Sequence, residues 1–409
     1  MKKLLIISTD WPAPHYSAAG VRLMQLVGFF QAEKYRITIA STADKSGVNA
    51  SDFVGIELVS ILLNDASFDA FLSDLSPDVV LFDRFMAEEQ FGWRVAEHVP
   101  NALRILDTED LHSLRKVREQ ALKQNIEFTK SSWLQNDLTK REVASIYRCD
   151  FSLIISSFEM ELLKPIVTNH ESLLLHLPFM MNALDDLTTK WNPFEKRKDF
   201  IFIGFGGHAP NIDAIGQLKN EIWPLIKLAL PESTLHIYGS NFPQSITQLH
   251  DVKAGFLIKG WAENAEKVIA NARIMLAPLR FGAGLKGKLT DAMRCGTPSI
   301  TTSIGAEGLH GGIPWNGKIC DDPKIFAQEA IALYGNKKEW EQCQRNGIAI
   351  VNACFDKKGL EAQLKSKLAS VQTNLDLHRS NNFLGEMLRH QTMASTKYMS
   401  KWIEEKNRD

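Results

Sequence analysis

The sequence predicts an α/β protein built from two domains, each a doubly wound parallel sheet. Its 409 residues exceed what one hydrophobic core ordinarily organises, which favours two domains of roughly 150–200 residues each. Short continuous apolar runs, such as residues 4–7 and 200–203, indicate strands that are buried on both faces, as in parallel sheets. In both halves these runs are followed by polar or glycine-containing loops and then by helical patterns.

Composition and charge exclude several classes of protein. The formal net charge is −1, so overall basicity gives no reason to expect nucleic acid as a partner. A hydrophobic fraction of 44% and a charged fraction of 23% are normal for a globular enzyme. The cysteines are odd in number and lack C-x-x-C spacing, which argues against a disulfide framework or a zinc site and fits a reduced, cytoplasmic compartment: Cys149, Cys295, Cys320, Cys343 and Cys354.

We expect a soluble or peripherally attached protein. The apolar run at residues 4–8 is too short for a secretion signal and is followed by Asp10 and Pro12, and no run approaches the ~18–20 residues of a membrane span. Residues 111–148 hold eight Lys or Arg against four acids. A solvated helical face is the favoured interpretation. A surface that docks at the inner face of an anionic membrane, or on a phospholipid-linked acceptor, is the alternative.

The elements of the first half follow in order. Residues 4–7 form the first strand, a loop at 10–20 leads to a helix at 21–32, and residues 36–40 form the next strand. Further strands are predicted at residues 79–82, 103–106 and 151–155, followed by a helix at 158–164 that Ser157 and Glu161 cap, and by an apolar run at 173–178.

Three acids and a histidine follow the strand at residues 103–106: Asp107, Glu109, Asp110 and His112. Ligands of open α/β sheets bind at the carboxyl ends of strands, so His112 is a candidate ligand contact. A metal site is one interpretation of the acids, although the chain has no D-x-D motif. Helix capping by Thr108, with acids in the first turn, is the other.

The second half repeats the pattern after a polar, aperiodic segment at residues 182–199, which predicts a linker. Strands are predicted at residues 200–203, 234–240, 256–261, 274–277 and 299–302. A glycine-rich loop at 204–211 follows the first of these, and its His208 is expected to be solvated. Helices with apolar stripes are predicted at residues 323–336, 338–354 and 382–406.

The chemistry gathers at residues 274–309. The strand at 274–277 is followed by a loop that carries cations and glycines and opens a helix at 289–294: Arg280, Gly282, Gly284, Lys286 and Lys288. Glycines let a backbone approach a phosphate, and the first N–H groups of a helix are free donors at the positive end of its dipole. Arginine and lysine add full charges, so the stretch predicts a diphosphate site.

The same residues resemble a family. The pattern P-L-R-x-G-x-G-x-K-x-K, followed by C-G-T-P and G-A-E-G-L, is similar to the donor-site motif of group 1 (GT4-like) glycosyltransferases. These have the GT-B fold, two Rossmann-like domains facing a cleft, and move a sugar from a nucleotide carrier with retention of its anomeric configuration. The resemblance implies that Lys286, Lys288 and Arg280 face the donor diphosphate and that Asp291 binds the ribose. The chain departs from the pattern at Ala283, where the family has a glutamate.

The resemblance implies further contacts. Residues 204–211 look like the first turn of the family's second domain, and Gly20 with Arg22 matches a loop near the donor phosphates and the acceptor. His112 would contact the acceptor or the donor sugar, and Trp261 the nucleobase, with a buried core position as the alternative for Trp261. The candidate substrate-binding residues are Gly20, Arg22, Gly204, Gly206, Gly207, Asn211, Gly239, Trp261, Gly282, Gly284, Asp291, Gly305, Ala306, Glu307 and Gly308.

The expected domains are residues 1–185 on the acceptor side, 196–372 for the nucleotide sugar, and a helix at 378–409 that packs back on the first domain. Kinship implies a cytoplasmic enzyme of cell-surface polysaccharide or lipopolysaccharide synthesis, with a nucleotide-sugar donor, a glycan or lipid-linked acceptor, and neither metal nor cofactor. Two alternatives stay open: a nucleotide-sugar 2-epimerase of the same fold, and a non-catalytic nucleotide-binding relative.

Overall fold

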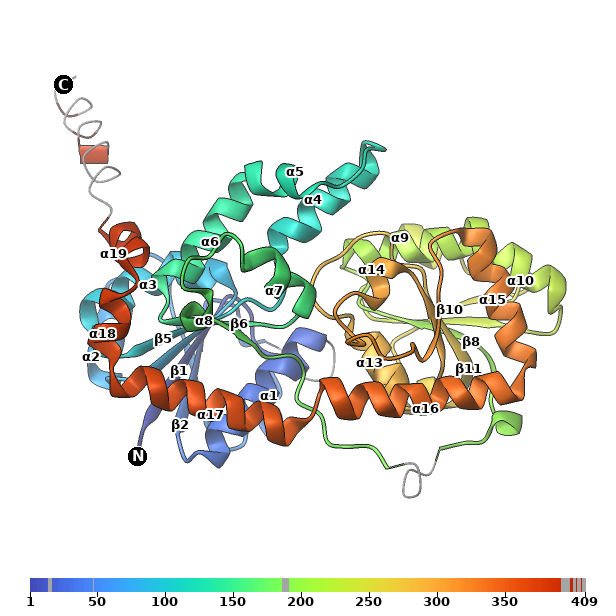
Figure 1. The fold of residues 1–409 in the computed structure, drawn as a ribbon, viewed down its shortest axis with the longest axis horizontal. Helices are drawn as coiled ribbons and strands as arrows, with labels where there is room; N and C mark the ends of the chain where they lie inside the picture. The colour runs from blue at the N-terminus through green and yellow to red at the C-terminus, as the bar shows by residue number, and fades with distance from the viewer. Residues whose placement is uncertain are drawn as a thin grey trace.

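The fold consists of two parallel sheets, one in each half of Figure 1, with helices on both faces of each sheet. The computed structural model describes residues 1–13, 17–46, 48–185 and 191–390, together with residues 398, 399, 402 and 406. The strand orders are β3-β2-β1-β4-β5-β6-β7 and β10-β9-β8-β11-β12-β13. The predicted class, two doubly wound α/β domains, is confirmed.

All neighbouring strands are paired in parallel. The first sheet contains β1 (Lys3–Ser8), β2 (Arg36–Ser41), β3 (Ile56–Ser60), β4 (Val79–Asp83), β5 (Leu103–Asp107), β6 (Phe151–Ile154) and β7 (Leu174–His176). The second contains β8 (Lys198–Ile203), β9 (Leu235–Tyr238), β10 (Phe256–Gly260), β11 (Ala272–Ala277), β12 (Ser299–Thr301) and β13 (Gly317–Ile319). Of the four edge strands, β3 and β13 escaped prediction.

The helices connect the strands and cover the sheets. In the first half they are α1 (Ala18–Ala32), α2 (Ser67–Leu75), α3 (Phe85–His98), α4 (His112–Lys123), α5 (Lys130–Gln135), α6 (Asp137–Arg148), α7 (Ser157–Leu163) and α8 (His170–Leu173). The second half has α9 (Ala209–Gln217), continued by a π-helical turn (Leu218–Ile222), then α10 (Trp223–Ala229), α11 (Gln244–Thr247), α12 (Ala265–Asn271), α13 (Gly287–Arg294), α14 (Ser303–Ala306), α15 (Pro323–Gly335) and α16 (Lys337–Cys354). The chain ends with α17 (Lys357–Thr373), α18 (Leu375–Ser380) and α19 (Phe383–Arg389).

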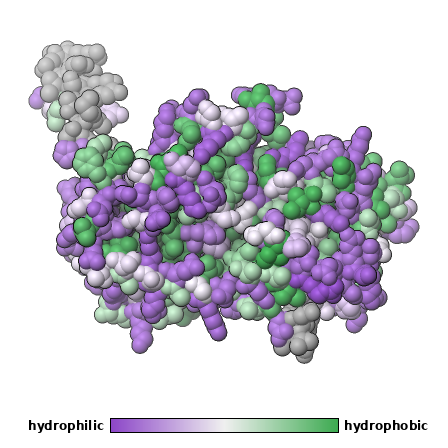
Figure 2. Space-filling model, viewed as in Figure 1, coloured by the Kyte–Doolittle hydropathy of each residue, from purple (hydrophilic) through white to green (hydrophobic). Residues whose placement is uncertain are grey.

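Each central strand is buried on both faces, as its continuous apolar run predicts. In β1, Leu5 and Ile7 pack into one hydrophobic cluster under the helices, whereas Leu4 and Ile6 pack into the cluster on the opposite face. Side chains alternate between the two faces of a strand, so every position in such a run needs an apolar residue. The surface seen in Figure 2 is mostly hydrophilic, with apolar residues in scattered groups. None of the described helices is both long and apolar enough to cross a membrane.

The last helices return to the first domain: in Figure 1, α17 continues the line of α16 below the sheets, and α18 and α19 follow at the left side of the first domain. Leu360, Leu364, Leu368 and Val371 of α17 recur at helical spacing and are buried in the same cluster as Leu4. We therefore propose that the domain division falls between α16 and α17 rather than at residue 372. Further on, α19 contacts α6. Most of the predicted helix at 382–406 lies outside the described residues.

The two segments that cross between the domains are hydrogen-bonded to each other. The backbone N–H of Met181 donates to the carbonyl of Phe355 at 2.8 Å, and the N–H of Lys357 donates to the carbonyl of Met181 at 3.0 Å. Met181 and Asp356 form a parallel bridge. The outgoing and returning chains are thus fixed side by side.

Two predictions of helix caps are wrong. The N-cap of α7 is Ser156, whose side chain makes no capping bond, and Glu161 instead pairs with Lys164. Thr108 does not cap α4, which begins only at His112, because its hydroxyl donates to the carbonyl of Leu153 at 3.0 Å.

Replacing Leu364 with alanine tests the packing of α17. The side chain is fully buried, so Leu364→Ala should lower the free energy of unfolding by about 2–5 kcal/mol. Urea denaturation followed by tryptophan fluorescence measures this. Lys365→Ala on the same helix is the control, because Lys365 is exposed and its ion pair with Glu33 is worth at most about 1 kcal/mol. Equal denaturation midpoints for the two variants would contradict the packing described.

Candidate active site

The carboxyl edge of the second sheet carries the loops that bring the candidate residues together. The strand order reverses between β8 and β11, and ligands of open α/β sheets bind in the crevice at such a point. The loop at 204–208 follows β8, and the loop at 278–286 follows β11. Lys288, in the first turn of α13 after the second loop, reaches Asn211 in the first turn of α9 after the first loop.

The ammonium group of Lys288 has unusual surroundings. Its Nζ lies 4.2 Å from the centre of the Phe202 ring and donates to Oδ1 of Asn211 at 2.5 Å. Burial lowers the pKa of Lys288 to about 7, and no carboxylate among the described residues counteracts that effect. The folded protein therefore holds a cation whose charge is stabilised only by an amide and an aromatic ring.

Glycines allow the loops to approach each other. A Cβ atom at Gly204 would lie 2.8 Å from Nζ of Lys288 and 2.7 Å from Nδ2 of Asn211. A Cβ atom at Gly239 would lie 2.0 Å from the carbonyl oxygen of Gly204. Asn211 is held in place because its Nδ2 donates to the carbonyl of Phe205 at 2.9 Å. Backbone atoms and small side chains thus form this part of the crevice.

Lys286 has a different electrostatic setting. It is buried, and its Nζ donates to the carbonyl of Gly284 at 3.0 Å. Burial lowers the pKa of Lys286 to about 8, while the carboxylates of Glu307 and Glu159 act in the opposite direction. Lys286 therefore has counter-charges that Lys288 lacks.

Arg118 of α4 joins the two domains. Its Nη1 and Nη2 each donate to a carboxylate oxygen of Glu307 at 2.8 Å, and Nη1 also donates to the carbonyl of Gly282 at 2.9 Å. Its guanidinium group lies 5.1 Å from the ring centres of both Phe128 and Phe158. A first-domain residue thus fixes Glu307, a candidate donor contact, in a bidentate pair.

Glu159 of α7 makes a second connection. Its Oε1 accepts from the backbone N–H of Leu111 at 2.9 Å and from that of Gly284 at 2.8 Å. Gly284 has a φ of +61°, and a Cβ atom there would lie 2.7 Å from Cβ of Asp110. The glycine loop of the second domain is therefore seated directly on the carboxyl edge of the first.

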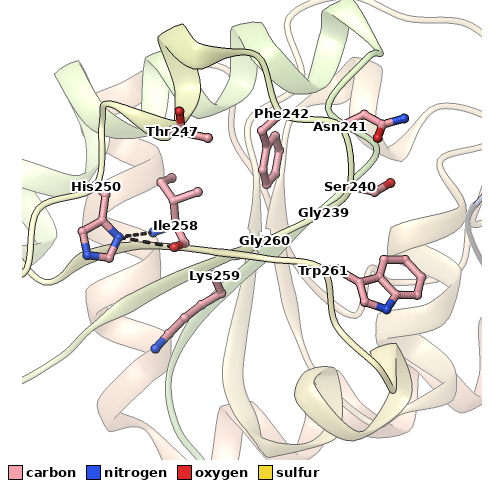
Figure 3. A pocket seen from close by; sticks show the side chains of 10 residues that line it. All are labelled: Gly239, Ser240, Asn241, Phe242, Thr247, His250, Ile258, Lys259, Gly260 and Trp261. Atoms are coloured by element: carbon pink, nitrogen blue, oxygen red, sulfur yellow. Dashed lines mark hydrogen bonds between the residues drawn. The ribbon is translucent and has the colours of Figure 1, made fainter.

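A pocket of about 670 Å³ opens between the carboxyl ends of β9 and β10 (Figure 3). Trp261 stands at one end of it near Ser240, and the side chain is 46% exposed. His250 lies at the other end, with Nδ1 3.2 Å from the backbone nitrogen of Ile258. The lining residues are Gly239, Ser240, Asn241, Phe242, Thr247, His250, Ile258, Lys259, Gly260 and Trp261. The pocket offers aromatic surface and backbone polar groups.

Comparison with known proteins identifies the second domain. Residues 197–336 match the family described as "Glycosyl transferases group 1". The matched residues span the second domain from β8 to α15. The predicted resemblance and enzyme class are confirmed. No match was found among curated proteins.

Solved glycosyltransferase structures share the whole fold. Sucrose-phosphate synthase from Thermosynechococcus elongatus aligns over 90% of this chain and 99% of its own, with a TM-score of 0.67 and 15% identity. TarM from S. aureus, in a complex that includes UDP, aligns over 90% of this chain and 99% of its own, with a TM-score of 0.70 and 9% identity. HepE from Anabaena, in complex with UDP and glucose, aligns over 90% of this chain and 100% of its own, with a TM-score of 0.63 and 12% identity. At such identities the likeness shows the fold, and the GT-B fold is confirmed.

Several predicted site residues of this glycosyltransferase lie outside the crevice. Arg280 forms a bidentate pair with Asp213 of α9 at the surface. The side chain of Asp291 is 45% exposed and lies 3.6 Å from Arg294. Arg22 is 1% exposed, because its guanidinium group is enclosed by Asp107 and the carbonyl of Leu177. That placement gives Arg22 a structural role in holding Asp107, and its role as a ligand contact stays a prediction.

The remaining candidates lie around the loops. His112 packs edge-on against Phe85, with Nε2 3.3 Å from Oδ1 of Asp110, and burial lowers its pKa. Gly20 in α1 lies against the backbone of Ala13. His208 is exposed, as expected. The other candidates occupy the loop after β8 or α14 and the turn after it: Gly206, Gly207, Gly305, Ala306 and Gly308.

The acids at the end of β5 and just after it neither form a metal site nor lie in the first turn of a helix. Asp107 pairs with Arg22, and Asp110 pairs with Arg115 and His112. Glu109 is buried, and burial together with the charge of Asp107 raises its pKa well above the ordinary range. No group of three or more His, Cys, Asp or Glu within the described ranges is placed to hold a metal ion.

Sequence reasoning missed Arg118 and Glu159 as site residues. The sequence marks Arg118 only as one of the cations in residues 111–148, and its capping pattern points to Glu161 and not to Glu159. A signal was present, because both occupy the apolar face of their helices. Arg118 shares its face with Leu114 and Ala121, and Glu159 with Leu163. A charge at a core-facing position indicates a buried partner or a ligand.

The pKa of Lys288 predicts a pH dependence of stability. An unfolded lysine keeps its proton up to its ordinary pKa of 10.5, whereas folded Lys288 loses it near 7. Between about pH 7 and 10 the unfolded state binds more protons, so stability should rise with pH. Lys288→Met should flatten that rise, measured by urea denaturation across this range, whereas exposed Lys365→Met should leave it unchanged. An unaltered slope in Lys288→Met would contradict the lowered pKa.

Proposed function

We propose that the protein is a retaining glycosyltransferase that moves a sugar from a nucleotide sugar to a glycan or lipid-linked acceptor. The observation that carries the proposal is the ammonium group of Lys288, desolvated and without a carboxylate partner, in the crevice between β8 and β11. A diphosphate would supply the missing counter-charge. The N–H groups of Gly287 and Lys288, the first two of α13, precede the first hydrogen bond of the helix and lie at the same edge.

The pocket between β9 and β10 suits the nucleoside half of such a donor. It lies at the same carboxyl edge as the crevice, and Gly239 of its lining is in contact with Gly204. Trp261 and Phe242 offer rings to a base. UDP occurs in the structures of HepE and TarM, which have the same fold. UDP is therefore the first nucleotide to test.

The chemistry assigned to the chain is electrostatic. As the bond between the sugar's C1 and the diphosphate oxygen breaks, negative charge grows on the diphosphate, and Lys288 in its protonated form stabilises it. The acceptor oxygen bonds to C1 on the face that the diphosphate leaves, and its proton passes to the diphosphate. No side-chain nucleophile or metal enters this scheme, and Asn211 orients the ammonium group through its Oδ1.

Kinship and one neighbour suggest a role in the cytoplasmic synthesis of cell-surface glycans. A lipopolysaccharide outer core galactosyltransferase, WaaB, shares the fold with a TM-score of 0.59 and 14% identity. Contact with a membrane has less support. Most cations of residues 111–148 are already paired, as in Lys123–Glu119, Lys140–Asp137 and Arg141–Glu89. The favoured interpretation of that segment is therefore a solvated face.

Lys288→Ala should weaken donor binding and turnover together, because a charge-assisted contact to the diphosphate is lost. The expected rise in the Kd for UDP is about 10–100-fold. Isothermal titration calorimetry measures it, and Lys365→Ala, exposed and far along the chain, is the control. UDP affinity and transfer at the wild-type level in Lys288→Ala would remove the proposal.

Trp261→Ala should weaken binding of UDP about 3–10-fold through the lost ring contact, while leaving binding of inorganic pyrophosphate unchanged. Competition of each ligand against a fluorescent UDP analogue measures both values. A loss of pyrophosphate binding equal to the loss of UDP binding would show that Trp261 does not face the base.

The 2-epimerase alternative is supported by Glu159, because burial raises its pKa to about 7, suitable for proton transfer. Incubation with UDP-N-acetylglucosamine and no acceptor separates the two activities. Release of UDP by slow hydrolysis supports the transferase, and formation of the 2-epimer supports the alternative.

A further inference from the structure

Glu159 has a carboxylate oxygen for which the fold supplies no partner. The residue is 1% exposed, and both backbone N–H groups that it binds go to Oε1. Its Oε2 is buried and has no hydrogen-bond partner among the described residues. Buried carboxylate oxygens in native proteins are nearly always hydrogen-bonded, so an open one at a candidate site indicates a missing donor.

The surroundings of this oxygen differ from those of Lys288. Lys286, Asp110 and Arg22 face Glu159 closely enough to influence its charge, and Glu307 is near Lys286. Two of these cations are already engaged, since Arg22 binds Asp107 and Lys286 donates to Gly284. An anionic phosphate would meet carboxylates here. A neutral hydroxyl can donate to Oε2 and accept from a remaining N–H of Lys286.

We propose that Glu159 binds the sugar of the nucleotide-sugar donor, with a sugar hydroxyl donating to Oε2 and Lys286 donating to the hydroxyl oxygen. This inference rests on the proposed function. The diphosphate binds at Lys288, which has no carboxylate beside it among the described residues. The sugar binds near Lys286, where Glu159 and Glu307 lie. Ala283 has no carboxylate to offer, and Glu159 brings one from the other domain to the adjacent residue, Gly284.

The position of Glu159 has a consequence for binding. Lys288, Asn211 and the pocket at Trp261 all belong to the second domain, whereas Glu159 belongs to the first. A nucleoside diphosphate therefore binds to the second domain alone. The sugar of a complete donor gains its contact with Glu159 only when the loop at Gly284 is seated on the first domain.

The test compares nucleotide and nucleotide-sugar affinities in Glu159→Gln. Glutamine keeps an oxygen for the N–H groups of Leu111 and Gly284 but places an N–H₂ group where Oε2 accepts. Calorimetry with UDP, UDP-glucose, UDP-galactose and UDP-N-acetylglucosamine first finds the sugar that the wild type prefers. Glu159→Gln should change the Kd for UDP less than twofold and raise that for the preferred nucleotide sugar at least tenfold. Glu161→Gln, exposed on the same helix, should change neither.

Each other outcome overturns the inference. Equal weakening of UDP and UDP-sugar would show that Glu159 only connects the domains, and unchanged affinity for both would show that Oε2 has no ligand. If Glu159→Gln does not fold, Lys286→Met replaces it and should show the same split between UDP and UDP-sugar. A wild type that binds neither UDP, GDP nor ADP would overturn the proposed function itself, before any variant is compared.

Discussion

A desolvated ammonium group, with no carboxylate partner in the part of the chain that the structure describes, is the feature on which the rest of the site depends. Removing Lys288 from water costs free energy that Asn211 and the ring of Phe202 recover only in part. The loops at 204–208 and 278–286 must come close enough to enclose it, which explains glycine at positions 204 and 239. An anion bound there would relieve the electrostatic penalty, so the site is organised before its ligand arrives.

The two lysines of the site have different electrostatic surroundings, which favour two different kinds of ligand group. On one side Lys288 has the amide of Asn211 and the ring of Phe202 for neighbours. On the other, Lys286 has Glu307, Glu159 and Asp110 within electrostatic range. Phosphates prefer the first environment and hydroxyl groups the second. Two lysines separated by a single residue can therefore have different partners, although the sequence pattern treats them alike.

Much of the fold could be predicted from the sequence, because strands buried on both faces need continuous apolar runs. The strands β3 and β13 escaped because neither contains a buried residue, so neither carries the continuous apolar run that marks a strand, whereas the other two edge strands, β7 and β10, each have one buried residue. Within the site, Lys288 and Asn211 stand in the first turns of α13 and α9, directly after glycine-containing loops that local patterns mark. Arg118 and Glu159 could not be placed, because their partners Glu307 and Gly284 are 189 and 125 residues away along the chain. Such distances carry no local pattern. Arg22 matched a motif position, yet tertiary burial against Asp107 decided its role.

The paired crossing at Met181 and Phe355 limits how the two halves can move. With one connection the domains could twist or separate in any direction. Two crossing segments that are hydrogen-bonded side by side leave chiefly a hinge rotation about the line through them. In Figure 1 the junction of α16 and α17 lies below the boundary between the two domains, and α4 lies above it. The largest displacement then falls on the α4 side, at Arg118 and Glu307. A donor would therefore enter and leave on the side of the domain boundary that is farthest from the hinge at Met181.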